Sequence, residues 1–98
     1  MAPATITTDQ AAAIGHTIGI DWDTSPFDVE QFRAGMAIEL EHGSRDPQTD
    51  VTSDDLTLTG MIAWAHLKEF PDYYDRLAVM ERQAHQEWDA KSAQRRSA

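Results

Sequence analysis

The chain of 98 residues contains no cysteine, which excludes disulfides, thiolate metal ligands and a cysteine nucleophile. Its five glycines are isolated, so no glycine-rich phosphate-binding loop is present. No apolar run approaches the roughly 18 residues that a membrane helix needs. The opening stretch MAPATITTDQ lacks the basic and apolar regions of a signal peptide. We therefore expect one small domain with no membrane partner, and by default a cytoplasmic location.

Basic residues are scarce, with 8 Lys and Arg against 17 Asp and Glu and a formal net charge of −9. Residues 1–75 hold 14 acidic and 3 basic side chains and carry −11, whereas residues 76–98 hold 3 acidic and 5 basic ones and carry +2. Because nucleic-acid binding depends on Lys and Arg that neutralise phosphates, this composition argues against a nucleic-acid partner. The basic tail KSAQRRSA, with Lys91, Arg95 and Arg96, is typical of a solvated terminus.

Two helices are predicted in the first half of the chain. Thr7 or Thr8 is a suitable cap for a short N-terminal helix that ends near Gly19. Asp28 and Gln31 form a capping box for a second helix over about 28–42, and Gly43 predicts a left-handed stop. The buried stripe of this second helix is Val29, Phe32, Met36 and Leu40.

A polar loop leads to a third helix capped by Thr52 or Ser53. One face of this helix carries Leu58, Ile62 and Ala65. Nearly the opposite face carries Leu56, Ala63, Leu67 and Phe70, and two apolar faces are typical of the central helix of a bundle. Pro71 forces a break and suits the first turn of a fourth helix. The apolar row of that helix is Tyr73, Leu77, Met80, Ala84 and Trp88.

These patterns predict an all-α fold, and no alternating run of residues predicts a strand. The expected architecture is a small bundle of three main helices plus a short N-terminal helix, with the third helix central. We expect one domain over residues 1–98, ordered over about 7–88, with a frayed basic tail over 89–98.

Two Glu/His pairs at i, i+3 spacing are the candidate site: Glu39 with His42, and His66 with Glu69. Helical bundles use this spacing to direct two ligands at one metal ion. Two carboxylates and two imidazoles suit Zn²⁺, Fe²⁺ or Mn²⁺ in a mononuclear site or one shared across a dimer, with Glu81 as a fifth candidate ligand. Glu69 falls in an apolar row, where an unpaired carboxylate costs several kcal/mol.

Geometry and a simpler interpretation count against the metal site. In a tight antiparallel hairpin of the second and third helices, His66 would lie about 18 Å from His42. Only a 43–53 loop that doubles back brings the pairs together, and it is long enough to span about 30 Å. The simpler interpretation is that His42 stabilises a helix end and pairs with Glu39, while Lys68, a tyrosine hydroxyl or a capping contact at the Pro71 break satisfies Glu69.

The segments GIDW, FDVEQFRAGMAIELEHG and IAWAHLKEFPDYYDRLAVME resemble a small uncharacterised domain family of bacterial and phage genomes. Its hallmarks are an E-x-E-H-G or E-x-E-H-T helix end and a later H-L-x-E-x-P-x-Y-Y-x-x-L segment, and the resemblance covers roughly residues 14–82. Trp64 departs from the smaller residue expected before this segment. The resemblance implies a domain of unknown function and no activity, cofactor or partner. The matching residues are Glu39, Glu41, His42, Gly43, His66, Leu67, Glu69, Pro71, Tyr73, Tyr74 and Leu77.

For function, we favour a non-enzymatic accessory or interaction protein whose partner is another protein or a second copy of itself. The alternative is a metal-binding protein that uses Glu39, His42, His66 and Glu69. A metalloenzyme needs an open coordination position and a cleft, and a bundle of this size has little room for one.

Overall fold

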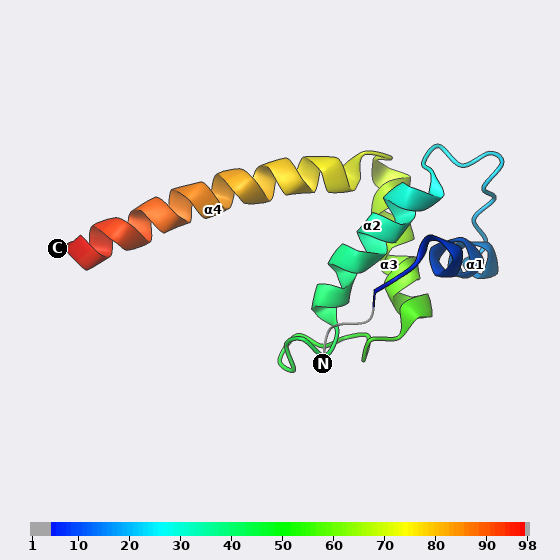
Figure 1. Cartoon of the computed structure of the whole chain (residues 1–98), viewed down its shortest axis with the longest axis horizontal. Helices are drawn as coiled ribbons and strands as arrows, with labels where there is room; N and C mark the ends of the chain where they lie inside the picture. The colour runs from blue at the N-terminus through cyan, green and yellow to red at the C-terminus, as the bar shows by residue number, and fades with distance from the viewer. Residues whose placement is uncertain (1–4, 98) are drawn as a thin grey trace.

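The computed structural model describes residues 5–97, and this part of the chain contains four α-helices and no β-strand (Figure 1). The predicted all-α class is therefore confirmed. None of the described helices combines the length and the apolar character that a membrane crossing requires. The elements are α1 (Thr8–Ile18), α2 (Val29–Glu39), the short 3₁₀ helix η1 (Leu40–His42), α3 (Leu56–Glu69) and α4 (Tyr73–Ser97).

The first two helices start where the sequence predicts. Thr7 caps α1, and its side chain and that of Gln10 satisfy each other's backbone N–H groups. Asp28 and Gln31 do the same for α2, with both hydrogen bonds at 2.8 Å. These capping boxes satisfy backbone donors that the first helical turn leaves unpaired. At the other end of α1, Gly19 adopts the left-handed conformation with φ of 112°.

Gly43 differs from the prediction, because its φ of −100° is not left-handed. A close contact requires glycine here instead. A Cβ atom at this position would lie 2.0 Å from Oδ1 of Asp54, which accepts the backbone N–H of Ser44 at 2.8 Å. The glycine therefore allows the loop after η1 to lie against the segment that precedes α3.

The cap of α3 also differs, because Asp55 takes the place predicted for Thr52 or Ser53. Its Oδ1 accepts the backbone N–H of Leu58 at 2.9 Å. Ser53 and Asp54 cannot cap the helix because both have positive φ angles, 52° and 63°, in the turn before it. The cap of α3 is therefore a carboxylate and not a hydroxyl.

Helices α1, α2 and α3 enclose the core, and α2 and α3 each contact all three other helices. The central position predicted for the third helix is therefore shared with α2. Phe32 and Met36 of the predicted stripe are fully buried. The buried apolar residues are Ile6, Ala11, Ile20, Phe27, Phe32, Met36, Ala63, Leu67 and Tyr74.

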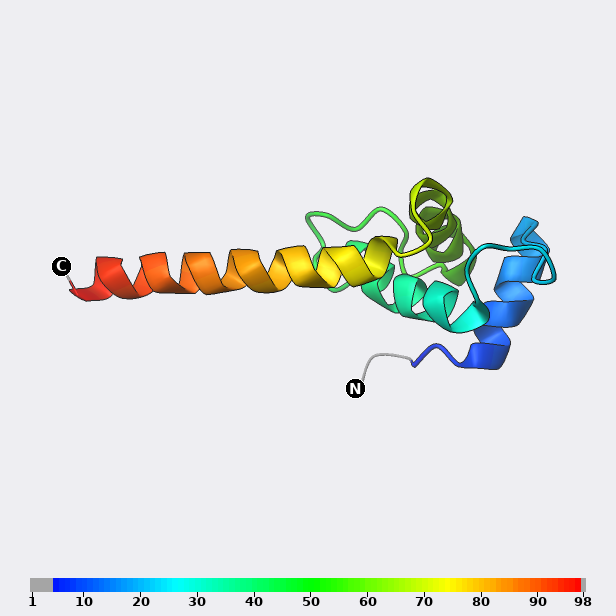
Figure 2. The same ribbon diagram turned by 90° about the horizontal axis from the view of Figure 1, so that it is seen from above.

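Helices α2 and α3 cross instead of forming a tight antiparallel hairpin (Figures 1 and 2). A Cβ atom on Gly60 would come within 3.2 Å of Phe32, and Glu39 contacts His66 at 2.8 Å. The segment between α2 and α3 keeps the start of α3 beside the end of η1, since Val51 N–H donates to His42 O at 2.8 Å and Ser44 N–H to Asp54 Oδ1 at 2.8 Å. The two helices then run in roughly opposite directions and cross steeply (Figure 1), and at this crossing the side chains of Glu39 and His66 meet.

The outer face of α3, which we define as Leu58, Met61, Ile62 and Ala65, is turned to solvent. Leu58 is 45% exposed and Met61 is 52% exposed. Ile62 is half-buried, and Ala65 is exposed. The opposite face carries the buried Ala63 and Leu67. Of the two apolar faces predicted for this helix, only one meets the core.

Helix α4 leaves the body of the protein and extends away from it (Figures 1 and 2). The radius of gyration is 16.0 Å, against about 13 Å for a compact domain of this length. Tyr73, Tyr74 and Leu77, in the first turns, pack on the core. The region predicted as a frayed tail continues the helix to Ser97 and is exposed over residues 89–95, while Ala98 lies outside the described residues.

Candidate functional site

The candidate site is centred on Glu39, which is only 3% exposed in the last turn of α2. It is buried on the same face as Phe32, Gly35 and Met36. Its Oε2 atom accepts the hydroxyl of Tyr74 at 2.6 Å and lies 2.8 Å from Nδ1 of His66. One carboxylate therefore joins three helices, because Tyr74 belongs to α4 and His66 to α3.

His66 is held by two contacts of different kinds. As a carboxylate, Glu39 can only accept hydrogen bonds, so Nδ1 of His66 carries the proton that it donates. The same nitrogen lies 3.1 Å from the Tyr74 hydroxyl. The imidazole also stacks on the ring of Tyr73, with centroids 4.4 Å apart and planes 2° from parallel. These contacts fix both the position and the plane of the imidazole ring.

Tyr74 is 6% exposed and lies across the backbone of α2. A Cβ atom on Gly35 would come 2.5 Å from its Cε2 atom, so only glycine permits this approach. Burial, followed by the hydrogen bond to Glu39 and the negative charge of that carboxylate, raises the pKa of Tyr74 far above its ordinary value. The hydroxyl therefore remains a donor to Glu39.

His42, on η1, lies at the edge of this arrangement. Its Nε2 atom is 3.5 Å from Oε1 of Glu39, and its side chain is 56% exposed. The predicted i, i+3 contact between Glu39 and His42 is therefore present. We call Glu39, His42, His66 and Tyr74 the Glu39 cluster. The crossing of α2 and α3 thus brings three of the four predicted ligands together.

The other two candidate ligands lie outside the Glu39 cluster. The Glu69 side chain is exposed and takes part in none of the hydrogen bonds or ion pairs found among residues 5–97. Glu81 is half-buried on α4 and likewise makes no polar contact with the cluster. None of the partners proposed for Glu69 serves it. Lys68 lies 3.9 Å over the ring of Trp64 and the Tyr74 hydroxyl goes to Glu39. Among the described residues, neither Tyr73 nor the break at Pro71 supplies a hydrogen bond to the Glu69 side chain. The buried carboxylate is Glu39, and the expectation that Glu69 is the buried one is wrong.

As arranged, the Glu39 cluster is a satisfied hydrogen-bond network. No buried polar side-chain atom in the described part of the chain lacks a hydrogen-bond partner. Over the same residues, no group of three or more His, Asp or Glu side chains has the arrangement of a metal site. The network is therefore suited to holding the C-terminal turns of α2 and α3 against the first turn of α4.

Sequence reasoning missed the role of Tyr74, although the signals were present. Gly35 and Glu39 are four residues apart and lie on one face of α2 next to Phe32. Another helix approaches closely at Gly35, and the approaching residue is Tyr74. A buried carboxylate beside a close helix contact requires a donor from that second helix.

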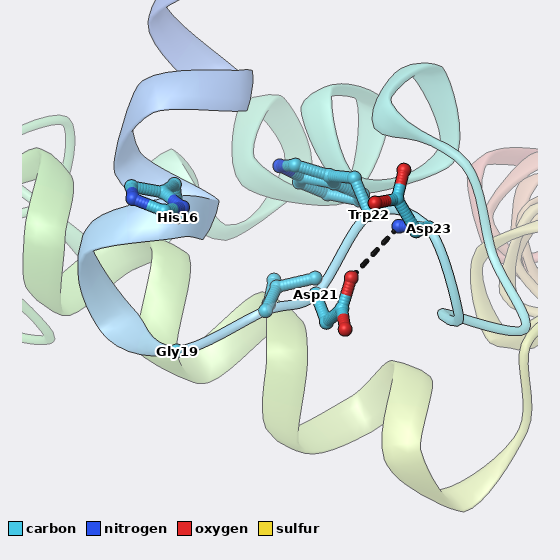
Figure 3. Close-up of a pocket in the computed structure, with 6 residues that line it drawn as sticks. His16, Gly19, Asp21, Trp22 and Asp23 are labelled. Atoms are coloured by element: carbon cyan, nitrogen blue, oxygen red, sulfur yellow. Dashed lines mark hydrogen bonds between the residues drawn. The ribbon is translucent and has the colours of Figure 1, made fainter.

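A separate hollow of about 440 Å³ lies at the end of α1, lined by His16, Gly19, Ile20, Asp21, Trp22 and Asp23 (Figure 3). Oδ1 of Asp21 accepts the backbone N–H of Asp23 at 2.9 Å, which is an Asx turn. His16 is exposed, as expected for a surface residue. The polar groups here stabilise the turn between α1 and α2, and the hollow shares no lining residue with the Glu39 cluster.

Comparison with protein families gives one match, over residues 11–83, to a family described as "Protein of unknown function (DUF5661)". No curated protein matches the chain, and no solved structure matches it. The matched range includes every residue of the Glu39 cluster and the first turns of α4.

Replacing Tyr74 by Phe removes the donor to a buried carboxylate. We expect Tyr74→Phe to lower the free energy of unfolding by about 1.5–3 kcal/mol, measured by urea denaturation at pH 7. Tyr73→Phe is the matched control. It keeps the stack on His66 and removes a hydroxyl that makes no hydrogen bond among the described residues, so its effect should stay below about 0.5 kcal/mol. Equal effects of the two variants would contradict the role given to Tyr74.

The same variants give an alkaline test. The unfolded chain loses the Tyr74 proton near pH 10, whereas the folded chain keeps it. The contribution of Tyr74 to the free energy of unfolding of the wild type is therefore complete below pH 10 and declines above it. The decline approaches about 1.4 kcal/mol per pH unit for one proton. It should be absent in Tyr74→Phe and present in Tyr73→Phe.

Proposed function

We propose that this chain, which belongs to the DUF5661 family of proteins of unknown function, is a non-enzymatic interaction module that presents one face of α4 to another protein. The observation that carries the proposal is a helix of 25 residues that projects from the body with an exposed apolar row. The partner would cover this row.

The apolar row, which we call the α4 stripe, consists of Leu77, Met80, Ala84 and Trp88. Its members recur at intervals of three, four and four residues, so they form a nearly straight row on a 3.6-residue helix. Met80 is 53% exposed and Trp88 is 56% exposed. Leu77, at the near end of the stripe, also packs against the core, and the rest of the row lies where no other helix covers it. Large apolar side chains in such a row are typical of a contact surface.

The Glu39 cluster supports this proposal because it orients the helix that carries the stripe. Tyr74 is fixed by Glu39 and by the backbone at Gly35, and Tyr73 is fixed by the stack on His66. The first turn of α4 is therefore anchored to both α2 and α3. A surface held in one direction loses less conformational entropy on binding than a mobile one.

Photo-crosslinking in the cells that express the protein tests the proposal. A photoreactive amino acid at Ala84, on the α4 stripe, should give a discrete cross-linked product. The same probe at Gln86 lies on nearly the opposite side of the helix, about 160° from Ala84, is exposed, and should give little. Equal yields from the two positions, or no product from Ala84, would contradict an interaction through the stripe.

Convergence of Glu39, His42 and His66 favours metal binding as a second candidate function. His66 donates Nδ1–H to Glu39, which leaves Nε2 as the nitrogen that can bind a metal ion. A carboxylate that orients a histidine in this way is common around protein metal ions. His42, half-exposed beside the same carboxylate, is the second imidazole of the Glu39 cluster.

Titration of metal-free protein with Zn²⁺, Fe²⁺ and Mn²⁺, followed by calorimetry, tests this second function. Near-stoichiometric binding that is lost in both His42→Ala and His66→Ala, but kept in the control His16→Ala, would support it. Binding that is absent in the wild type, or equal in all three variants, would remove it.

A further inference from the structure

We propose that the partner of the α4 stripe is a second copy of this chain, and that the stripe of each copy lies on the outer α3 face of the other. This inference rests on the interaction function proposed above and names its partner. It concerns two exposed apolar surfaces of one chain that cannot meet within that chain.

The two surfaces are alike in kind and similar in length. The outer α3 face carries Leu58 and Met61, 45% and 52% exposed, and the α4 stripe carries Met80 and Trp88, 53% and 56% exposed. Each spans about two to three helical turns. Ridges of one helix can therefore pack into the grooves of the other along the full length of both surfaces.

The connection between the helices prevents this contact within one copy. Only three residues separate the end of α3 at Glu69 from the start of α4 at Tyr73. The first turn of α4 is fixed over α2 by Tyr74, and the rest of the helix extends away from the body (Figures 1 and 2). The α4 stripe of a second copy can cover the outer α3 face, which the α4 of the same chain cannot reach.

Charge complementarity favours a second copy as the occupant. The row of the α4 stripe continues toward the C-terminus into Lys91 and Arg95, which lie on the same side of the helix. Lys91 pairs with Glu87 at 3.0 Å and lies 4.4 Å over the ring of Trp88, whereas no ion pair is found for Arg95 among the described residues. The body is strongly acidic, since residues 1–75 carry a net charge of −11. Acidic residues stand at both ends of α3, with Asp55 as its cap and Glu69 as its last residue. A basic extension of the stripe therefore meets an acidic surface.

This interface is self-complementary, because the α4 stripe of each copy contacts the outer α3 face of the other. Such an isologous arrangement closes as a two-fold dimer and leaves neither apolar surface exposed. Pairing of α4 with α4 would cover the stripe but leave the outer α3 face in solvent. The two arrangements give opposite results for variants of α3.

Sedimentation equilibrium of the purified full chain, over about 1–500 µM, tests the inference. Trp88→Glu on the stripe and Met61→Glu on the outer α3 face should each weaken self-association at least about 10-fold. The controls are Val79→Glu, on the other side of α4 and 43% exposed, and Val51→Glu, in the loop before α3 and 72% exposed. Both should associate like the wild type, and circular dichroism should show the same helicity in all variants.

Mixing the two interface variants is the sharper measurement. The Met61→Glu chain keeps an intact stripe, and the Trp88→Glu chain keeps an intact outer α3 face. A dimer of the two variants therefore contains one intact pair of surfaces. The mixture should therefore associate more strongly than either variant alone. An unaffected Met61→Glu variant, or a mixture no stronger than its components, would overturn the exchange in favour of α4 pairing with itself.

The basic extension has its own matched comparison. Arg95→Glu, in line with the stripe, should weaken self-association several-fold more than Arg82→Glu, which makes the same change of net charge on another side of α4. Equal effects would contradict the charge argument.

Failure of this inference is distinguishable from failure of the interaction function. A wild-type chain that remains monomeric at 500 µM, while the probe at Ala84 captures a different protein, would overturn the second copy but keep the interaction function. A monomer without any stripe-specific cross-link would overturn both.

Discussion

A buried carboxylate in the last turn of α2 is the constraint on which the rest of the structure depends. Glu39 is withdrawn from water, so it requires donors, and they come from two other helices: His66 of α3 and Tyr74 of α4. Removing any of these groups leaves a buried polar atom without its partner, which costs more than the hydrogen bond itself contributes. The crossing of α2 with α3, and the starting point of α4, therefore follow from where this one side chain is buried.

The direction of α4 links this network to function. A long helix with few intramolecular contacts has no packing of its own along its distal turns, and most of the stability of protein helices comes from packing of an apolar face. The Glu39 cluster anchors only the first turn, so the stripe beyond it depends on another surface for cover. The outer α3 face is likewise an apolar surface that no other helix of the chain covers. One contact between two copies would cover both surfaces, so the proposed interaction function and the proposed dimer follow from the same geometry.

Local signals predicted much of the fold, and long-range contacts account for what they missed. The cap at Thr7, the capping box at Asp28 and the stripe with Phe32 and Met36 depend on residues a few positions apart, and all were confirmed. The site was half predicted: Glu39, His42 and His66 do converge, but Tyr74 was not among the candidates and Glu69 faces solvent. A helical wheel shows two apolar faces on α3 without showing which one meets the core. That choice depends on the direction in which α3 crosses α2, for which the sequence has no periodic signal.

Whether the Glu39 cluster holds α4 in one direction can be measured directly, because the chain has no cysteine and accepts two spin labels cleanly. Labels at Ala13 on α1 and Ala90 on α4, both exposed, report the direction of α4 relative to the body by double electron–electron resonance. An excess of unlabelled protein restricts the signal to distances within one copy. We expect a single narrow distribution in the wild type and in Tyr73→Phe, and a broad one in Tyr74→Phe. A distribution that is equally narrow in Tyr74→Phe would contradict the central role of the buried carboxylate.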